Sequence, residues 1–259
     1  MIYKKITYLQ LMIFFIFNAN VFADTTLVAV ASNFTKPMTE IAAEFEKATG
    51  HTAQLSFGSS GKFVSQFENG APFEVFLSAD DKSPAKLQQS GFAVEGSNFT
   101  YALGKLVLWS NAANYIDEKG EILAKGGFQH IALADPKLAP YGAAAIEVLK
   151  SENLLDKLQP LFVLGENISQ TYQFISTGNA ELGFVAMSQV SENGKITSGS
   201  GWIVPQALYA PIKQDAVLLT LGAKNPAATA LLDYLKSAPA KAIIKKHGYD
   251  LPNVYAHIR

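Results

Sequence analysis

The chain has 259 residues, of which 49% are hydrophobic and 17% charged, a composition typical of a packed globular protein and not of a disordered one. Its formal net charge is −1, which argues against a nucleic-acid binder. It contains no cysteine, so disulfides, thiolate metal sites and lipid attachment through cysteine are excluded.

The first 23 residues are expected to form a cleavable secretory signal peptide. Lys4 and Lys5 precede the apolar run 6–17, and small residues stand at the −3 and −1 positions before Asp24. The apolar run is about a dozen residues long, which is short of the roughly 20 that a membrane-spanning helix needs. Removal of the two lysines leaves a net charge of −3. We therefore expect a mature periplasmic protein without a membrane span.

Strands and helices alternate through the first hundred residues. Each predicted strand is a short apolar run, and each predicted helix has apolar residues at helical spacing. This alternation predicts a parallel sheet with right-handed crossovers. The strands are predicted at 26–31, 52–57 and 75–79, and the helices run up to Gly50, from Phe63 to Gly70, and from Ser83 through Leu87.

The same pattern restarts after a long apolar segment at 101–109. Strands are predicted at 131–134, 161–164, 182–187 and 216–221, and helices at 143–149, 171–176, 226–235 and 238–247. The last strand and the last two helices are expected to return to the first unit. The sequence thus predicts an α/β protein of two lobes facing each other across a cleft. Lobe 1 is discontinuous, with residues 24–104 and 210–259, and lobe 2 comprises residues 105–209.

Four predicted strand-to-helix turns are polar and small. They contain Ser32-Asn33, Ser59-Ser60, Tyr141 and Ile168. In open α/β sheets ligands bind beyond the carboxyl ends of the strands, where helix starts offer free backbone N–H groups to an anion. Ser and Asn are also preferred helix caps, so one such turn alone indicates little. Four turns meeting at one cleft favour an anion site without guanidinium groups, because the one arginine is Arg259.

Catalytic and metal chemistry find weaker support in the sequence. The run Gly58-Ser59-Ser60-Gly61 is not a Gly-x-Ser-x-Gly elbow, and none of the four histidines stands in a triad context. Asp80 and Asp81 lack metal-ligand spacing, and Asp80 is expected to cap the following helix. No phosphate-binding loop occurs. A secreted serine hydrolase using Ser60 remains the enzymatic alternative.

Several motifs resemble one family closely. They are Ser-Phe-Gly-Ser-Ser-Gly-Lys-Phe at 56–63, Gly-Ala-Pro-Phe-Glu-Val-Phe-Leu-Ser-Ala-Asp at 70–80, Ala-Pro-Tyr-Gly at 139–142 and Gly-Glu-Asn-Ile at 165–168. The chain resembles the periplasmic molybdate-binding proteins of ABC transporters from about residue 26 to residue 248. The resemblance implies a type II periplasmic binding fold, with two mostly parallel sheets flanked by helices and the ligand between the lobes.

The resemblance also implies the ligand and its contacts. Molybdate and tungstate are the expected ligands, bound by Ser32, Asn33, Ser60, Tyr141 and, through its backbone, Ile168. No cofactor, no free metal cation and no catalysis are implied. The expected partner is the membrane permease of an ABC transporter, and the protein is expected to be a monomer.

One position departs from the common family pattern. Many members carry a tyrosine in the third strand of lobe 2, where this chain has Ala186, and Tyr141 stands where those members have a small residue. We therefore expect the Tyr141 hydroxyl to replace the lost one.

Selectivity and lobe movement complete the sequence-based picture. A dianion without a proton needs only hydrogen-bond donors, and a site made only of donors disfavours protonated phosphate. The lobes are expected to close about residues 101–109 and 209–218. Another tetrahedral oxyanion such as sulfate is the alternative ligand.

Overall fold

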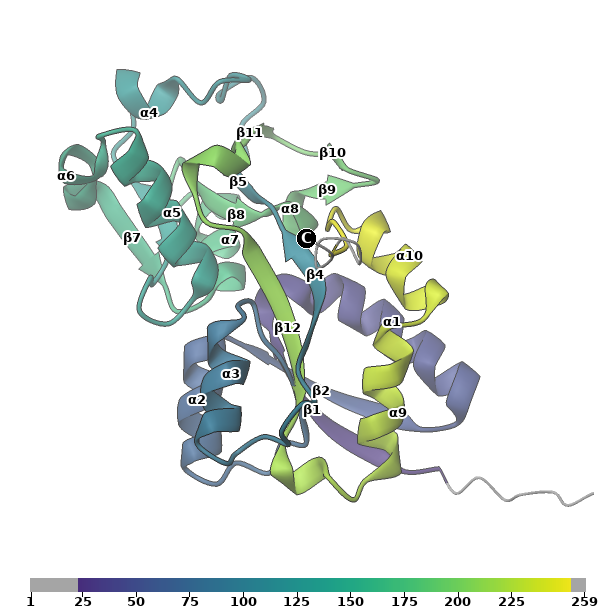
Figure 1. The fold of residues 1–259 in the computed structure, drawn as a ribbon. Coiled ribbons are helices and arrows are strands. Elements are labelled where there is room, and N and C mark those ends of the chain that lie inside the picture. The colour runs from purple at the N-terminus through teal and green to yellow at the C-terminus, as the bar shows by residue number, and fades with distance from the viewer. Residues whose placement is uncertain (1–22, 253–259) are drawn as a thin grey trace, which may run out of the picture.

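The computed structural model describes residues 23–252 and contains two lobes, each built on a five-stranded sheet (Figure 1). The predicted signal peptide lies, apart from Ala23, outside the described residues. None of the described helices is long and apolar enough to cross a membrane. The two-lobed α/β architecture expected from the sequence is confirmed.

The first sheet combines strands from both ends of the described chain. Strand β1 pairs in parallel with β2 and β3, whereas β12 is antiparallel to both of its neighbours, β3 and β4. Four of its five strands therefore point the same way. In spatial order the sheet contains β2 (Thr52–Gly58), β1 (Thr25–Ala31), β3 (Val75–Leu77), β12 (Ile212–Leu218) and β4 (Phe99–Gly104).

The second sheet repeats this arrangement. Strand β6 pairs in parallel with β7 and β8, and β5 is the strand that runs against both of its neighbours, β8 and β11. In spatial order it contains β11 (Ser200–Ile203), β5 (Leu106–Ser110), β8 (Leu182–Ala186), β6 (Ile131–Ala134) and β7 (Phe162–Gly165). A separate hairpin pairs β9 (Ser191–Glu192) with β10 (Lys195–Ile196).

Helices cover both faces of the first sheet because successive side chains of its strands point to opposite sides. Val28 and Val30 of β1 pack with one group of helices, and Ala29 packs with the other. The first group is α1 (Thr35–Thr49), α9 (Pro226–Leu235) and α10 (Ala238–Lys246). The second group is α2 (Ser60–Glu68) and α3 (Lys82–Gln89).

The second sheet is covered in the same way. Leu106 and Leu108 of β5 face one cluster, while Val107 and Trp109 face the other. The first cluster includes α4 (Ile122–Lys125), α5 (Pro140–Ser151) and α6 (Leu155–Leu158), and the second includes α7 (Ile168–Ser176) and α8 (Met187–Val190). Short 3-10 turns η1 (Ser32–Phe34), η2 (Gln159–Leu161), η3 (Gln206–Leu208) and η4 (Thr220–Gly222) complete the elements.

The chain passes between the two sheets twice. The apolar segment 101–109 is two strands, β4 and β5, which meet at Lys105 and belong to different sheets; the return runs from β11 to β12. We propose the lobe boundaries 24–104 with 210–259 for lobe 1 and 105–209 for lobe 2, because these crossings fall there.

Several predicted strand limits are wrong. The strand predicted at 75–79 ends at Leu77, and the strand predicted at 161–164 runs from Phe162 to Gly165. The strand predicted at 216–221 runs from Ile212 to Leu218, and residues 220–222 form η4. The first half of this strand contains the polar residues Gln214 and Asp215, so it does not form an apolar run. Both residues are buried because they have hydrogen-bond partners. The strand predicted at 182–187 ends at Ala186, where α8 begins.

Candidate functional site

A small cavity of about 10 Å³ lies between the lobes, beyond the carboxyl ends of their parallel strands. The turns after β1 and β2 line it from lobe 1, and the starts of α5 and α7 line it from lobe 2. All five residues predicted to bind an anion are among its walls, so the four predicted turns meet at one place. The lining consists of Ala31, Ser32, Asn33, Gly58, Ser59, Ser60, Ala79, Ala139, Pro140, Tyr141, Asn167 and Ile168.

Three of these residues lie in the first turn of a helix, where backbone N–H groups have no intrahelical partner. Ser60 begins α2, Ile168 begins α7, and Tyr141 follows Pro140 at the start of α5. Among the described residues, no acceptor forms a hydrogen bond with these three N–H groups. Because a helix start carries positive partial charge, the three N–H groups make the cavity attractive to an anion.

Ser32 joins the two lobes beside the cavity. Its Oγ donates to Oδ1 of Asn167 at 3.3 Å, and its carbonyl oxygen accepts from Oγ of Ser169 at 3.2 Å. Asn167 also caps α7, because its Oδ1 accepts from the backbone N–H groups of Ser169 and Gln170. Asn167, which the sequence analysis did not single out, therefore holds the start of α7 against lobe 1.

Asn33 is held by a buried polar network. Its Nδ2 donates to Oε1 of Gln214 at 2.8 Å and to the hydroxyl of Tyr249 at 2.9 Å. Its carbonyl oxygen accepts from Oγ of Ser188 at 2.7 Å and from the Tyr249 hydroxyl at 2.8 Å. Both protons of the Asn33 amide are thus used within the protein, so the side chain fixes the first turn. Gln214 and Tyr249 were not among the residues predicted from the sequence.

Ser60 is almost completely buried, and its hydroxyl is oriented by lobe 1. The Oγ of Ser60 accepts from the backbone N–H of Ala79 at 3.0 Å. A hydroxyl that accepts in this way still has its own proton to donate. Ser60 can therefore offer the cavity both a side-chain donor and a backbone donor.

Tyr141 is also buried, and its hydroxyl lies towards the crossing between the lobes. Nε2 of Gln214 donates to it at 3.4 Å, and Gly104 lies against it without room for a side chain. Burial raises the pKa of Tyr141 well above its usual value, and the nearby hydroxyls of Tyr249 and Tyr209 add to this effect. Tyr141 therefore stays neutral. Whether its hydroxyl replaces the one missing at Ala186 stays a prediction.

The region around Ala186 is filled by a neighbouring glutamine. Oε1 of Gln189 accepts from the backbone N–H of Ala186 at 2.9 Å, and Nε2 of Gln189 donates to the carbonyl oxygen of Ile168 at 3.0 Å. Gln189 thus ties the start of α7 to the end of β8. Through these two bonds Gln189 helps to place Ile168 at the cavity.

The described residues that line the cavity carry no charge. Lys62, one turn further along α2, pairs instead with Glu166 of lobe 2 at 2.5 Å, and both side chains are about half exposed. The backbone N–H of Gly61 donates to the carbonyl oxygen of Leu138 at 2.9 Å, again across the lobes. Direct contacts between the lobes therefore surround the cavity, and the lobes are closed.

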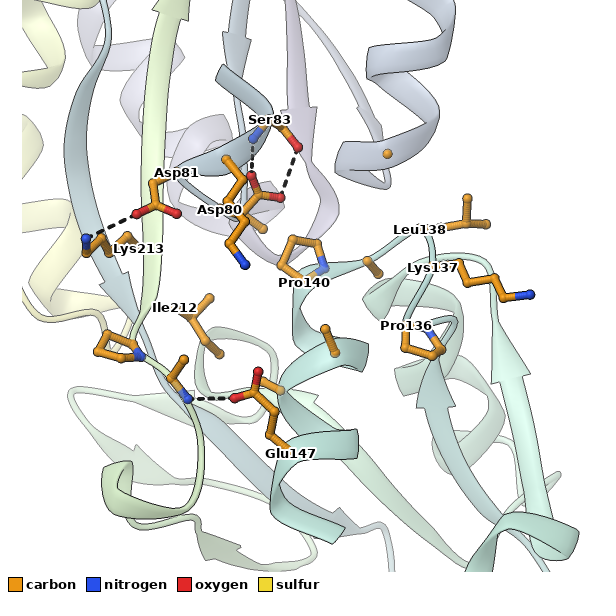
Figure 2. Close-up of a pocket in the computed structure, with 18 residues that line it drawn as sticks. Asp80, Asp81, Ser83, Pro136, Lys137, Leu138, Pro140, Glu147, Ile212 and Lys213 are labelled. Atoms are coloured by element: carbon orange, nitrogen blue, oxygen red, sulfur yellow. Dashed lines mark hydrogen bonds and ion pairs between the residues drawn. The ribbon is translucent and has the colours of Figure 1, made fainter. Parts of the chain in front are cut away.

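A larger cleft of about 400 Å³ adjoins the cavity and shares three of its residues, Ala79, Ala139 and Pro140. Figure 2 shows the carboxylates of Asp80, Asp81 and Glu147 engaged within the protein. Asp81 pairs with Lys213 at 3.1 Å, and Glu147 accepts from the backbone N–H of Ala210 at 2.7 Å. The cleft is therefore polar, but its carboxylates have partners.

Asp80 stands in this cleft and was predicted to cap α3; the N-cap residue is Asp81, and Asp80 bonds to the first turn of the helix from one residue further back. Its carboxylate accepts from the backbone N–H and from the hydroxyl of Ser83. Burial raises the pKa of Asp80, and the bonds from Ser83 oppose that shift. The group is thus committed to the start of a helix.

The site offers no arrangement for catalysis or for a bare metal ion. The described residues contain no group of three or more His, Asp or Glu side chains that could hold a cation. The cavity lining contains no His, Asp or Glu to act as a base for Ser60. A hydrolase mechanism through Ser60 therefore has no support in this geometry.

Comparisons with known proteins identify similar chains over most of the length. Residues 26–250 match the family described as bacterial extracellular solute-binding protein. The molybdate-binding protein ModA of Azotobacter vinelandii is 58% identical over 224 residues, which cover 86% of this chain and 89% of that protein. The protein of the same name from Rhodobacter capsulatus is 56% identical over 227 residues, covering 88% of each.

Solved structures agree with these sequence matches. The periplasmic molybdate-binding protein of Azotobacter vinelandii superposes with a TM-score of 0.85 and 44% identity, covering 88% of this chain and 100% of that one. The sulfate-binding protein SubI of Mycobacterium tuberculosis superposes with a TM-score of 0.71 at 14% identity, covering 90% of this chain and 88% of that one. The second likeness bears on the fold alone.

Proposed function

This chain belongs to the family of bacterial extracellular solute-binding proteins, and from that premise we propose that it captures molybdate between its lobes and delivers it to an ABC transporter. It is a binding protein and not an enzyme. The A. vinelandii and R. capsulatus relatives that are more than half identical to it are both named for molybdate binding.

The observation that supports this function best is the cavity itself. It is small and its lining is uncharged. Hydroxyls line it, as do backbone N–H groups from both lobes that have no acceptor within residues 23–252. A tetrahedral dianion without a proton accepts hydrogen bonds and donates none, so a shell of donors matches it. Enclosing the anion between the lobes lets these donors act in a medium of low dielectric constant.

We assign the ligand contacts as follows. The hydroxyl of Ser60 donates, together with the backbone N–H groups of Asn33, Tyr141 and Ile168. The hydroxyl of Ser32 would also donate, by turning its single proton from Oδ1 of Asn167 to the anion. The side-chain amide of Asn33 keeps the first turn in place, since both of its protons are used within the protein. The Tyr141 hydroxyl is proposed as a further donor in place of the tyrosine missing at Ala186.

Tungstate is proposed as a second ligand, since its charge and shape match those of molybdate. Protonated phosphate is disfavoured, because its proton would face no carboxylate acceptor among the cavity residues. Sulfate, a smaller anion, would make stretched hydrogen bonds with the same donors.

The cellular setting follows from the same proposal. We propose that a signal peptide is cleaved before Asp24, that the mature protein works as a periplasmic monomer, and that the closed form is recognised by a membrane permease. Ligand binding would favour closure because both lobes contribute donors to one anion.

A thermal-shift panel tests the function. A ligand that binds only the native state raises the melting temperature by mass action. Molybdate and tungstate should raise it strongly, and sulfate, phosphate and chromate should do so much less at equal concentration. Absence of a shift with the first two anions would refute the proposal, and a dominant shift with sulfate would replace molybdate as the ligand.

A further inference from the structure

Ser59 occupies an unusual position beside the cavity. It is the residue that precedes α2, its backbone is extended, with φ −84° and ψ 146°, and it is only 2% exposed. It also lines the small cavity. The predicted ligand set contains its neighbour Ser60 and not Ser59.

A serine at this position of a helix usually accepts a hydrogen bond from one of the first backbone N–H groups of the helix. Ser59 makes no such bond. The N–H of Gly61, one of the groups that it would normally accept from, donates instead to the carbonyl oxygen of Leu138 in the other lobe. One of the usual partners of the Ser59 hydroxyl is therefore occupied by Leu138.

Within residues 23–252, Oγ of Ser59 has no hydrogen-bond partner at all. Buried hydroxyls without partners are rare in folded proteins because losing water without a replacement is costly. The hydroxyl of Ser60 has a partner in the N–H of Ala79, so the two adjacent serines differ in this respect. Ser59 lines the small cavity between the lobes and does not line the four larger clefts at Asp80, Trp202, Lys105 and Asn98.

We propose that the Ser59 hydroxyl donates a hydrogen bond to the bound oxyanion, as a binding residue beyond the predicted set. This inference rests on the proposed function. The turn after β2 would then offer the anion two adjacent hydroxyls and the backbone N–H of Ser60. The dianion would supply the hydrogen-bond partner that the Ser59 hydroxyl lacks among residues 23–252.

The test compares two serine-to-alanine variants of the full mature chain by calorimetric titration with molybdate. Ser59→Ala should weaken binding by roughly tenfold or more, which is typical of losing a hydrogen bond to a charged group. The matched control is Ser65→Ala on the same helix, because Ser65 is exposed and its Oγ donates to the carbonyl oxygen of Gly61, outside the cavity. The control should bind like the unmodified protein.

A purely structural role for Ser59 predicts a different result. Replacing a helix-capping serine by alanine lowers the melting temperature of the ligand-free protein and leaves the affinity of the folded protein unchanged. We expect the reverse for Ser59→Ala, with a ligand-free melting temperature close to that of Ser65→Ala. Equal affinities of Ser59→Ala and the unmodified protein would overturn the inference.

A crystal structure of the unmodified protein with tungstate gives a test that needs no variant. An Oγ of Ser59 within about 3.2 Å of a tungstate oxygen supports the inference, and a water molecule between them overturns it. The two proposals fail separately. If the unmodified protein binds neither molybdate nor tungstate, the proposed function is wrong. If it binds them and Ser59→Ala binds them equally well, only this inference is wrong.

Discussion

Two neighbouring spaces between the lobes differ in almost every property. The small cavity has a volume of about 10 Å³ and no charged lining residue, whereas the adjoining cleft has about 400 Å³ and holds Asp80, Asp81, Glu147 and Lys213. The carboxylates of the cleft have partners within the protein. The backbone N–H groups of Ser60, Tyr141 and Ile168 in the cavity, in contrast, have none among the described residues.

Under the proposed function, the unsatisfied donors of the cavity, and not the size or charge of the cleft, indicate where the anion binds. A paired lysine in solvent offers an incoming anion little, because its charge is already compensated and is screened by water. A buried N–H without an acceptor gains a full hydrogen bond when the anion arrives. The predictions below test whether binding depends on the cavity and not on the cleft.

The largest effect is expected from Gly61→Val, at the border of the two spaces. A Cβ at Gly61 would lie 3.0 Å from the carbonyl oxygen of Leu138 and 3.2 Å from its Cα, so the branched side chain should hold the lobes apart. Overpacking of this kind costs about 1–3 kcal/mol, and molybdate affinity in calorimetry should fall by up to roughly 100-fold. Ser65→Val on the exposed side of α2 is the control, and equal affinities would show that the lobes need not touch at Gly61.

A comparable loss is expected from Ser60→Ala. It removes a hydroxyl proposed to donate to the anion, which is worth about 1.5–3 kcal/mol for a charged acceptor and corresponds to roughly 10- to 100-fold in the dissociation constant. The N–H of Ala79 also loses its acceptor, so the melting temperature should fall slightly. Calorimetry of Ser60→Ala beside Ser65→Ala measures the effect, and unchanged affinity would remove Ser60 from the site.

Tyr141→Phe tests the proposed exchange of hydroxyl groups. Loss of the hydroxyl also frees Nε2 of Gln214, and we expect affinities for molybdate and tungstate to fall by roughly two- to tenfold, as for a neutral hydrogen bond. Tyr172→Phe is the control, because Tyr172 stacks on Trp109 away from the cavity. If Tyr141→Phe binds both anions as before, the hydroxyl belongs to the Gln214 network alone.

The charges of the cleft should matter little. Lys213→Ala breaks the pair with Asp81, whose side chains are 51% and 40% exposed, and such pairs contribute about 0–1 kcal/mol. Molybdate affinity at physiological salt should change by less than about twofold. A tenfold loss in the same titration would mean that the cleft attracts the ligand.

The smallest effect is expected from pH. Burial raises the pKa of Tyr249 to about 12 and that of Tyr141 above its usual value, so both keep their protons near neutrality and would lose them only in strong alkali. Affinity measured between about pH 6 and about pH 9 should therefore stay nearly constant. A steep fall towards high pH would indicate a His or Lys in the site.

Much of the fold and site follows from local patterns in the sequence. Apolar runs and helix-start residues were sufficient to place Ser32, Ser60, Tyr141 and Ile168 at four turns, because a strand followed by a polar cap has a local signature. The strand β12 was misplaced because its polar first half is buried only through partners far along the chain, such as Asn33 and Thr100.

Contacts that join the lobes could not be predicted in the same way. The bond from Gly61 to Leu138 and the contact of Ser32 with Asn167 link residues that are distant in the sequence. The residue types do not indicate these partners. Any backbone carbonyl could accept from the N–H of Gly61, and Ser32 could donate to many side chains. The missing partner of Ser59 follows from these contacts, so it became visible only in the folded chain.

The position of β12 in the middle of the first sheet also constrains how the chain folds. This strand lies between β3 and β4, yet more than a hundred residues separate it from β4 in sequence. A chain made from its N-terminal end can complete the second sheet from the continuous stretch 106–203 while the first sheet still lacks an inner strand. Contacts of such long sequence separation form slowly. Lobe 2 should therefore gain protection from hydrogen exchange before lobe 1 during refolding, and simultaneous protection would show that the lobes fold as one unit.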